Sequence, residues 1–362
     1  MFFIEIIHLS LVQIRNWIAD LHIFCYPTVV MNLRNPSIDF MRVLAAFAVV
    51  WLHVSVGVVY GDPSVTSSGW WAGNLVDSFT RWSVPLFVML SGMLLLSAPA
   101  SASPLDFWRK RLRRLLPALV FWTLVFFVFR YFFEPPFGLK DALKSLLKGN
   151  PYYHTWYIYM LLGLTFITPY LHKLVAVISR QALLYLILGS FIIAAGESAY
   201  GGRIITFLPT FLPYVGYFLA GHYLATLDFT PKKRLFFIPL FLLCGLGISL
   251  ATAALLPVRD VRAYDLTYSN HNLLVVVMSL SIFLLLIKAP QVTGLWQRIA
   301  PVTLGVYAIH PLWVWALAKF GINGFWVHPA LGIPVTATLA FILSVLSAAL
   351  LARIPLLKRV VS

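Results

Sequence analysis

Residues 37–53 read Ser37-Ile-Asp-Phe-Met-Arg-Val-Leu-Ala-Ala-Phe-Ala-Val-Val-Trp-Leu-His53, and this stretch decides the class of fold. It opens an apolar run over about 38–60. A helix needs about 20 mostly apolar residues to cross a membrane. Ionisable side chains are costly inside such a helix, so any that occur there are candidates for function. The stretch holds three of them, Asp39, Arg42 and His53.

Nine further apolar runs follow along the chain. They cover about 79–98, 115–133, 155–171, 182–199, 205–226, 235–256, 272–288, 302–320 and 332–352. We therefore predict an all-α membrane protein with about ten transmembrane helices, in which residues 35–362 form a single polytopic domain. Residues 1–34 are interpreted as an N-terminal extension, either an amphipathic segment or sequence upstream of a true start at Met31.

The composition agrees with a membrane protein. The 362 residues are 60% hydrophobic and 11% charged, and the mean hydropathy is +0.87. A net charge of +15 would suggest a nucleic-acid partner in a soluble protein. Here sixteen Lys and Arg fall in loops on one side of the predicted spans and six on the other. This bias predicts that both termini are cytoplasmic, and it favours the lipid bilayer over nucleic acid as the partner.

The first span places its charged residues on one face. Arg42 and His53 are eleven residues apart, which is three helical turns plus about 20°, and about 16 Å along the axis. Asp39 precedes Arg42 by three residues and is expected to pair with it. An anionic cofactor with a long reactive arm would fit both Arg42 and His53. The alternatives are an interfacial anchor for Arg42 and a neutral His53 bonded to a neighbouring helix.

A second basic group lies between the second and third spans, in residues 107–117. Arg111 and Arg114 are three residues apart, so on a helix both could face one phosphate group. Lys110 and Arg113 are interpreted as topology signals only.

Three more residues are predicted to line a cavity: His310, Ser91 and Trp156. His310 and His53 are the only histidines placed well inside the predicted spans, whereas His154 is placed in an outer loop. The alternatives are helix packing for Ser91 and the interfacial aromatic belt for Trp156. The sequence contains no motif of an NTPase, a zinc protease or a serine hydrolase, and we predict no metal site.

Five stretches, in order, resemble the acyltransferase-3 family of integral membrane O-acyltransferases. They are Arg42 with His53, Arg81-Trp-Ser-Val-Pro-Leu-Phe-Val-Met-Leu-Ser-Gly92, Arg111-x-x-Arg114 before Pro117, His154-Thr-Trp-Tyr through Pro169, and Leu304-Gly-Val-Tyr-Ala-Ile-His310. The fourth is similar to the branch that includes the enterobacterial common antigen O-acetyltransferase.

The resemblance implies transfer of an acyl group, usually acetyl, from acyl-CoA to a hydroxyl of a cell-surface glycan or lipid-linked saccharide in a bacterial inner membrane. His53 matches the family's essential histidine, Arg42 its partner and Asp39 the preceding acidic residue. Arg111 and Arg114 match the cytoplasmic arginine pair that, with Arg42, would hold the phosphates of CoA. Within this reading His53 is a general base or the carrier of an acetyl group. The motifs predict no particular oligomeric state.

Two other functions compete with this one. A transporter or flippase of a glycan or small metabolite would also have about ten spans with buried His and Arg. A structural membrane partner in a polysaccharide synthesis complex would explain the basic loops but not the shared face of Arg42 and His53. Turnover of acetyl-CoA separates the enzyme from both.

Overall fold

The computed structural model describes residues 36–99, 103–199, 208–260, 262–288 and 294–362. Throughout these ranges the regular elements are helices, and eight of them are long and apolar enough to cross a membrane. The predicted all-α membrane fold is therefore confirmed. The predicted extension over residues 1–34 lies outside the described residues, and the orientation of the chain in the membrane stays a prediction.

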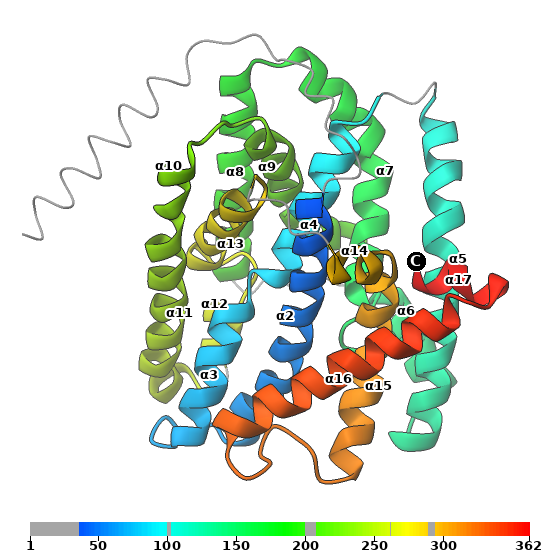
Figure 1. Cartoon of the computed structure of the whole chain (residues 1–362), viewed down its shortest axis with the longest axis vertical. Coiled ribbons are helices and arrows are strands. Elements are labelled where there is room, and N and C mark those ends of the chain that lie inside the picture. Colours follow the sequence, from blue (N-terminus) through cyan, green and yellow to red (C-terminus); the bar gives the residue numbers. More distant parts are fainter. Residues whose placement is uncertain (1–35, 100–102, 200–207, 261, 289–293) are drawn as a thin grey trace, which may run out of the picture. The chain divides into compact units, whose positions relative to one another are not determined.

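Helices carry all ten of the predicted spans (Figure 1). The full-length ones are α2 (Pro36–Gly61), α3 (Ser68–Thr80) with α4 (Ser83–Leu96), α5 (Pro104–Phe133), α7 (Trp156–Val177), α8 (Arg180–Ala199), α10 (Pro231–Leu235) with α11 (Phe237–Arg259), α14 (Leu295–Ile299) through η3 (Ala300–Val302) to α15 (Thr303–Lys319), and α16 (Pro329–Leu351). Shorter elements are α6 (Leu139–Leu147), η2 (Leu208–Tyr214), α9 (Val215–Ala225), α12 (Arg262–Thr267), α13 (Leu273–Leu286) and α17 (Pro355–Val361).

Two of the predicted spans are shorter than expected. The run at 272–288 forms α13, with 14 residues, and the run at 205–226 forms η2 followed by the 11 residues of α9. In η2 the backbone is a 3-10 helix that contains Pro213, and a proline cannot donate the hydrogen bond that an α-helix needs at that point. In the described part of the chain, eight of the ten predicted spans thus match helices long enough to cross a membrane, and two match shorter helices.

The second span begins earlier than predicted, at Ser68 instead of about residue 79. Polar residues lower the hydropathy of α3, but their side chains have hydrogen-bond or ion-pair partners inside the protein. The buried Asn74 amide donates to the carbonyl of Ser249 at 3.0 Å and accepts from the Tyr268 hydroxyl at 2.7 Å. The fully buried Asp77 forms an ion pair with Arg81 at 2.5 Å. Internal pairing is what makes such residues tolerable at membrane depth.

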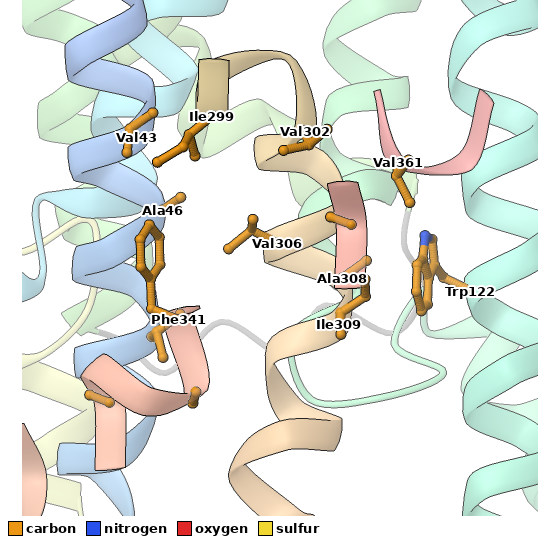
Figure 2. Close-up of a cluster of buried hydrophobic side chains, with 14 of the residues drawn as sticks. Val43, Ala46, Trp122, Ile299, Val302, Val306, Ala308, Ile309, Phe341 and Val361 are labelled. Carbon is orange, nitrogen blue, oxygen red and sulfur yellow. The ribbon is translucent and has the colours of Figure 1, made fainter. Parts of the chain in front are cut away.

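Helix α2 packs against α3, α4, α15 and α16 (Figure 1). Figure 2 shows the apolar cluster beside it, in which Val43 and Ala46 of α2 lie near Val306 of α15 and Phe341 of α16. These side chains are almost completely buried. The cluster holds α15 against α2 and so fixes the two helices relative to each other.

The last described helix, α17, returns to α5. The indole of Trp122 in α5 donates to the carbonyl of Val360 at 2.8 Å, and Val361 fills the space beside Gly305 of α15. Trp122 and Val361 also belong to the apolar cluster (Figure 2). The C-terminal residues are thereby fixed beside the basic first half of α5.

Candidate active site

Three histidines from distant parts of the chain form a cluster. The rings of His53 in α2 and His310 in α15 stack with centroids 5.1 Å apart and planes 20° from parallel. His154, just before α7, meets the His310 ring edge to face at 5.4 Å. His310 and His154 are buried, at 0% and 1% exposed, whereas His53 is partly exposed. His53 is therefore the member of this histidine cluster that a ligand can reach.

Hydrogen bonds fix the orientation of the two buried histidines. The hydroxyl of Tyr307 donates to the backbone carbonyl of His154, which ties the loop before α7 to α15. The Nδ1 of His310 lies 2.7 Å from the carbonyl of Tyr307. A carbonyl only accepts, so Nδ1 carries the proton and, in the neutral ring, Nε2 carries a lone pair. That Nε2 is buried and has no hydrogen-bond partner among the described residues.

A turn that the sequence analysis did not predict brings His154 into the histidine cluster. The Thr155 hydroxyl donates to the carbonyl of Tyr152 at 2.8 Å and accepts from its amide at 3.0 Å. His154 thus lies in a loop, as the sequence predicts, but its side chain is directed inward and buried. Burial, and then the charges of His310 and His53, lower the pKa of His154 well below its ordinary value. The signal available in the sequence was the His154-Thr-Trp motif itself.

The predicted phosphate-binding residues lie toward the other end of α2. Asp39 and Arg42 are 3.8 Å apart, with side chains 28% and 37% exposed, so the predicted pair forms at an accessible position. Arg114 in α5 is near enough for its positive charge to act on Arg42, so this end of the two helices is electropositive. Arg111 interacts with Arg114 in the same way, and its guanidinium lies 5.6 Å from the centre of the Phe107 ring.

Aromatic side chains connect the arginine end to the histidine cluster. The Tyr157 phenol of α7 is within electrostatic reach of Arg42. Its ring lies 5.2 Å from that of Tyr307, which in turn lies 6.0 Å from His310. Ring contacts thus run from Tyr157, which is near Arg42, through Tyr307 and His310 to His53.

A basic groove of about 1060 Å³ lies between the start of α5 and α17. Its cationic lining residues are Arg109, Lys110, Arg113, Arg114 and Arg359. Lys110 and Arg113 were interpreted as topology signals only, and Arg359 was missed, because its place in the groove depends on the return of α17. Five cations with no acidic residue in the lining suit a ligand with several phosphates.

The other two predicted cavity residues make their contacts elsewhere in the described part of the chain. Ser91 donates to the carbonyl of Phe87 in its own helix at 2.9 Å, a pattern common for serine in membrane helices. The Trp156 ring contacts in the described part of the chain are with Tyr157 and Tyr214. His310 is thus the one predicted cavity residue whose ring meets His53.

The charged residues around the histidine cluster complete the description of the site. The positive charge of Arg81, which is paired with Asp77, acts on His53; Arg81 stands in the second family motif but was not among the predicted site residues. Across the described residues, no group of three or more His, Cys, Asp or Glu is arranged to hold a metal ion. In the same ranges each of the four ion pairs joins an acid to Lys or Arg, so no carboxylate is paired with His53.

Comparison with known proteins identifies the family. A family model described as an acyltransferase domain matches residues 35–353, which is most of the chain. No curated protein and no solved structure matches it significantly. With a family match of this extent, and with helices long and apolar enough to cross a membrane, the chain belongs to the acyltransferase-3 family of membrane acyltransferases.

Proposed function

We propose that this acyltransferase moves an acetyl group from acetyl-CoA to a hydroxyl of a cell-surface glycan or lipid-linked saccharide. The observation that carries the proposal is the shared face of Arg42 and His53 on α2. Arg42 lies in an accessible basic site with Arg114, and His53, about 16 Å further along the helix, is the accessible member of the histidine cluster.

The basic end suits the phosphates of CoA. Arg42, Arg111 and Arg114 are the proposed phosphate ligands, and the adjoining groove adds Lys110, Arg113 and Arg359. Guanidinium groups bind phosphate oxygens in a bidentate manner, which gives both affinity and orientation. The flexible arm of CoA then runs past Tyr157 toward His53 and carries the thioester to the histidine cluster.

The chemistry requires a base near the thioester. Neutral His53 accepts the proton of the acceptor hydroxyl while the oxygen attacks the thioester carbonyl. The new C–O bond forms, the C–S bond breaks, and the proton passes to the departing thiolate to give free CoA. Such a base contributes about 10²- to 10⁴-fold to the rate. A relay through acetyl-His53 uses the same residues, and trapping of an acetylated protein without acceptor would distinguish it.

The proposal includes an orientation and a membrane. The arginine end faces the cytoplasm, where acyl-CoA is available, and the membrane is a bacterial inner membrane. The excess of Lys and Arg in the loops on that side supports this orientation. The described C-terminal residue, Ser362, lines the same basic groove and therefore lies at the same end of the bundle.

The decisive experiment is thermal unfolding of the purified protein with and without acetyl-CoA. A ligand at 100 times its dissociation constant stabilises the folded state by about 2.7 kcal/mol. We expect this stabilisation in the wild type and in Arg298→Ala, whose arginine is exposed on α14, and its loss in Arg42→Ala. Absence of stabilisation in folded wild type would contradict the proposal and favour a transporter.

A further inference from the structure

A second pocket lies at the opposite end of α5 from the basic groove. It has a volume of about 460 Å³, and its lining includes Arg130 at the end of α5 and Lys144 and Lys148 around α6. Arg113 of the basic groove and Arg130 are seventeen residues apart in one helix, which is about 26 Å along the axis. The two pockets therefore open at opposite ends of the helical bundle.

Tyr153 connects this pocket to the histidine cluster. Its side chain lines the pocket and is 48% exposed, and its ring centroid lies 4.9 Å from that of His53. The next residue, His154, is buried in the histidine cluster. A molecule in the pocket is thus separated from His53 by a single, accessible aromatic side chain. Aromatic rings at such positions commonly stack against sugar rings.

The acidic residues of the pocket are already engaged. Glu134 accepts a hydrogen bond from the Tyr152 hydroxyl at 2.9 Å and lies 3.6 Å from the guanidinium of Arg130. Asp141 accepts from the amide of Gly138 at 3.0 Å, which caps the start of α6. The charge of Glu134 is therefore balanced by Arg130, and the Asp141 carboxylate is engaged in capping α6.

The two lysines of the pocket remain available. Within the ranges that the structure describes, neither Lys144 nor Lys148 forms an ion pair. They are one helical turn apart, and the exposed Asn150 lines the pocket beside them. Two ammonium groups with an amide form a site for a carboxylate or phosphate group.

Helix α6 places the pocket at the membrane surface. Leu139, Leu143 and Leu147 are 77%, 53% and 65% exposed and recur every four residues, so they form one apolar stripe. The lysines are displaced from this stripe by one residue, or about 100° around the helix. A helix with this pattern lies in the membrane–water interface.

From these features we infer that the pocket beside Tyr153 binds the acceptor, and that the acceptor is an anionic saccharide with a carboxylate or phosphate close to the hydroxyl that is acylated. The inference rests on the proposed acetyl transfer, which it deepens. Lys144 and Lys148 bind the anionic group, Tyr153 packs against the sugar ring, and the reacting hydroxyl points past Tyr153 toward His53.

The test compares three defined acceptors with radiolabelled acetyl-CoA in nanodiscs. They are a glucuronate oligosaccharide, a glucose oligosaccharide of equal length, and glucose linked to a polyprenyl phosphate. We expect kcat/KM for at least one charged acceptor to exceed that for the neutral one by about tenfold or more. Preference for the glucuronate locates the charge on the sugar, and preference for the polyprenyl phosphate locates it at the lipid linkage.

The variants make the test specific to this pocket. In Lys144→Gln/Lys148→Gln the preference for the charged acceptor should be lost, with acetyl-CoA stabilisation unchanged. Lys140→Gln is the matched control, because Lys140 lies one turn earlier on α6 outside the pocket lining, and it should behave as wild type. If acetyl-CoA stabilises the protein but wild type shows no preference for a charged acceptor, or the double variant keeps it, the inference is wrong. Failure of acetyl-CoA stabilisation would instead contradict the proposed function.

Discussion

The rings of His53 and His310 stack at a centroid separation of 5.1 Å, although 256 residues separate them in the chain. The proton on Nδ1 of His310 is held by the carbonyl of Tyr307, so this ring is fixed both by packing and by a hydrogen bond. His53 has neither an ion-pair partner nor a recorded hydrogen bond in the described part of the chain. The buried histidine therefore orients the accessible one, and proton transfer is assigned to His53.

Substitution of His53 should separate catalysis from folding. We expect His53→Ala and the more conservative His53→Gln to lower the rate of acetyl transfer by about 100-fold or more, because a general base contributes at least that much. Both variants should still be stabilised by acetyl-CoA, since the proposed phosphate ligands are about 16 Å away along α2. The measurement is transfer of radiolabelled acetyl together with thermal unfolding.

His328→Asn serves as the control for that experiment. His328 is exposed and caps the start of α16 by accepting from the amide of Ala330 at 3.2 Å, and asparagine can make the same cap. This variant should keep full activity. Full activity in both His53 variants would remove His53 from the mechanism.

Arg359 should contribute to donor binding although it lies at the very end of the chain. It lines the basic groove on α17, which Trp122 and Val361 fix beside α5. We expect Arg359→Ala to raise KM for acetyl-CoA by about three- to tenfold with little change in kcat, as for the loss of one hydrogen bond worth about 0.7 to 1.4 kcal/mol. The matched control is Arg353→Ala, an exposed arginine outside the groove. Equal KM values for the two variants would exclude Arg359 from the donor site.

The stability of the protein should fall in mild acid because of His154. Burial and the neighbouring His310 and His53 lower its pKa in the folded state, whereas an unfolded histidine titrates near about 6.5. Below about pH 6.5 the unfolded state binds more protons at this histidine than the folded state does. The free energy of unfolding therefore has its full value above about pH 6.5. It falls as the pH drops toward the folded pKa, by at most about 1.4 kcal/mol per pH unit.

Unfolding midpoints between pH 8 and pH 5.5 check this prediction. His154→Asn removes the titrating group and should show a weaker pH dependence than wild type. It should keep part of the dependence, because burial also lowers the pKa of His271, to about 4, with the same sign. Identical slopes in wild type and His154→Asn would contradict a role for His154.

Local patterns in the sequence predict part of this site. The shared face of Arg42 and His53 follows from helical spacing alone, and the ion pair of Asp39 with Arg42 is confirmed at 3.8 Å. The early start of the second span was missed because Asn74 and Asp77 lower the hydropathy of α3. In the fold both side chains are buried beside partners: Asn74 meets Ser249 and Tyr268, and Asp77 meets Arg81.

The rest of the site depends on tertiary contacts that no local pattern encodes. His154 meets His310 only because the loop before α7 is tied to Tyr307. Arg359 joins the basic groove only because α17 packs back against α5. The sequence likewise does not separate Lys110 and Arg113 from other cations near the ends of spans. What distinguishes them is that they line the groove that this packing creates.

The contact between α4 and α9 provides a test of the packing itself. A Cβ atom added to Gly92 would overlap the backbone carbonyl of Phe218, and one added to Gly221 would overlap that of Met89. The two helices therefore approach backbone to backbone, as small residues permit in membrane proteins.

We expect Gly92→Ala to destabilise the protein by about 3 kcal/mol, at the upper end for overpacking, because the atom in the way is a backbone carbonyl and cannot move as a side chain does. The matched control is Gly189→Ala in α8, where an added Cβ meets nothing within 4 Å. It should be neutral or mildly stabilising, since alanine favours a helix more than glycine does.

Thermal unfolding in detergent checks both variants. A Gly92→Ala protein as stable as Gly189→Ala would show that α4 and α9 do not approach so closely. Because α4 also packs against α2 and α7, the Gly92 variant should lose acetyl transfer together with stability, whereas Gly189→Ala should keep both.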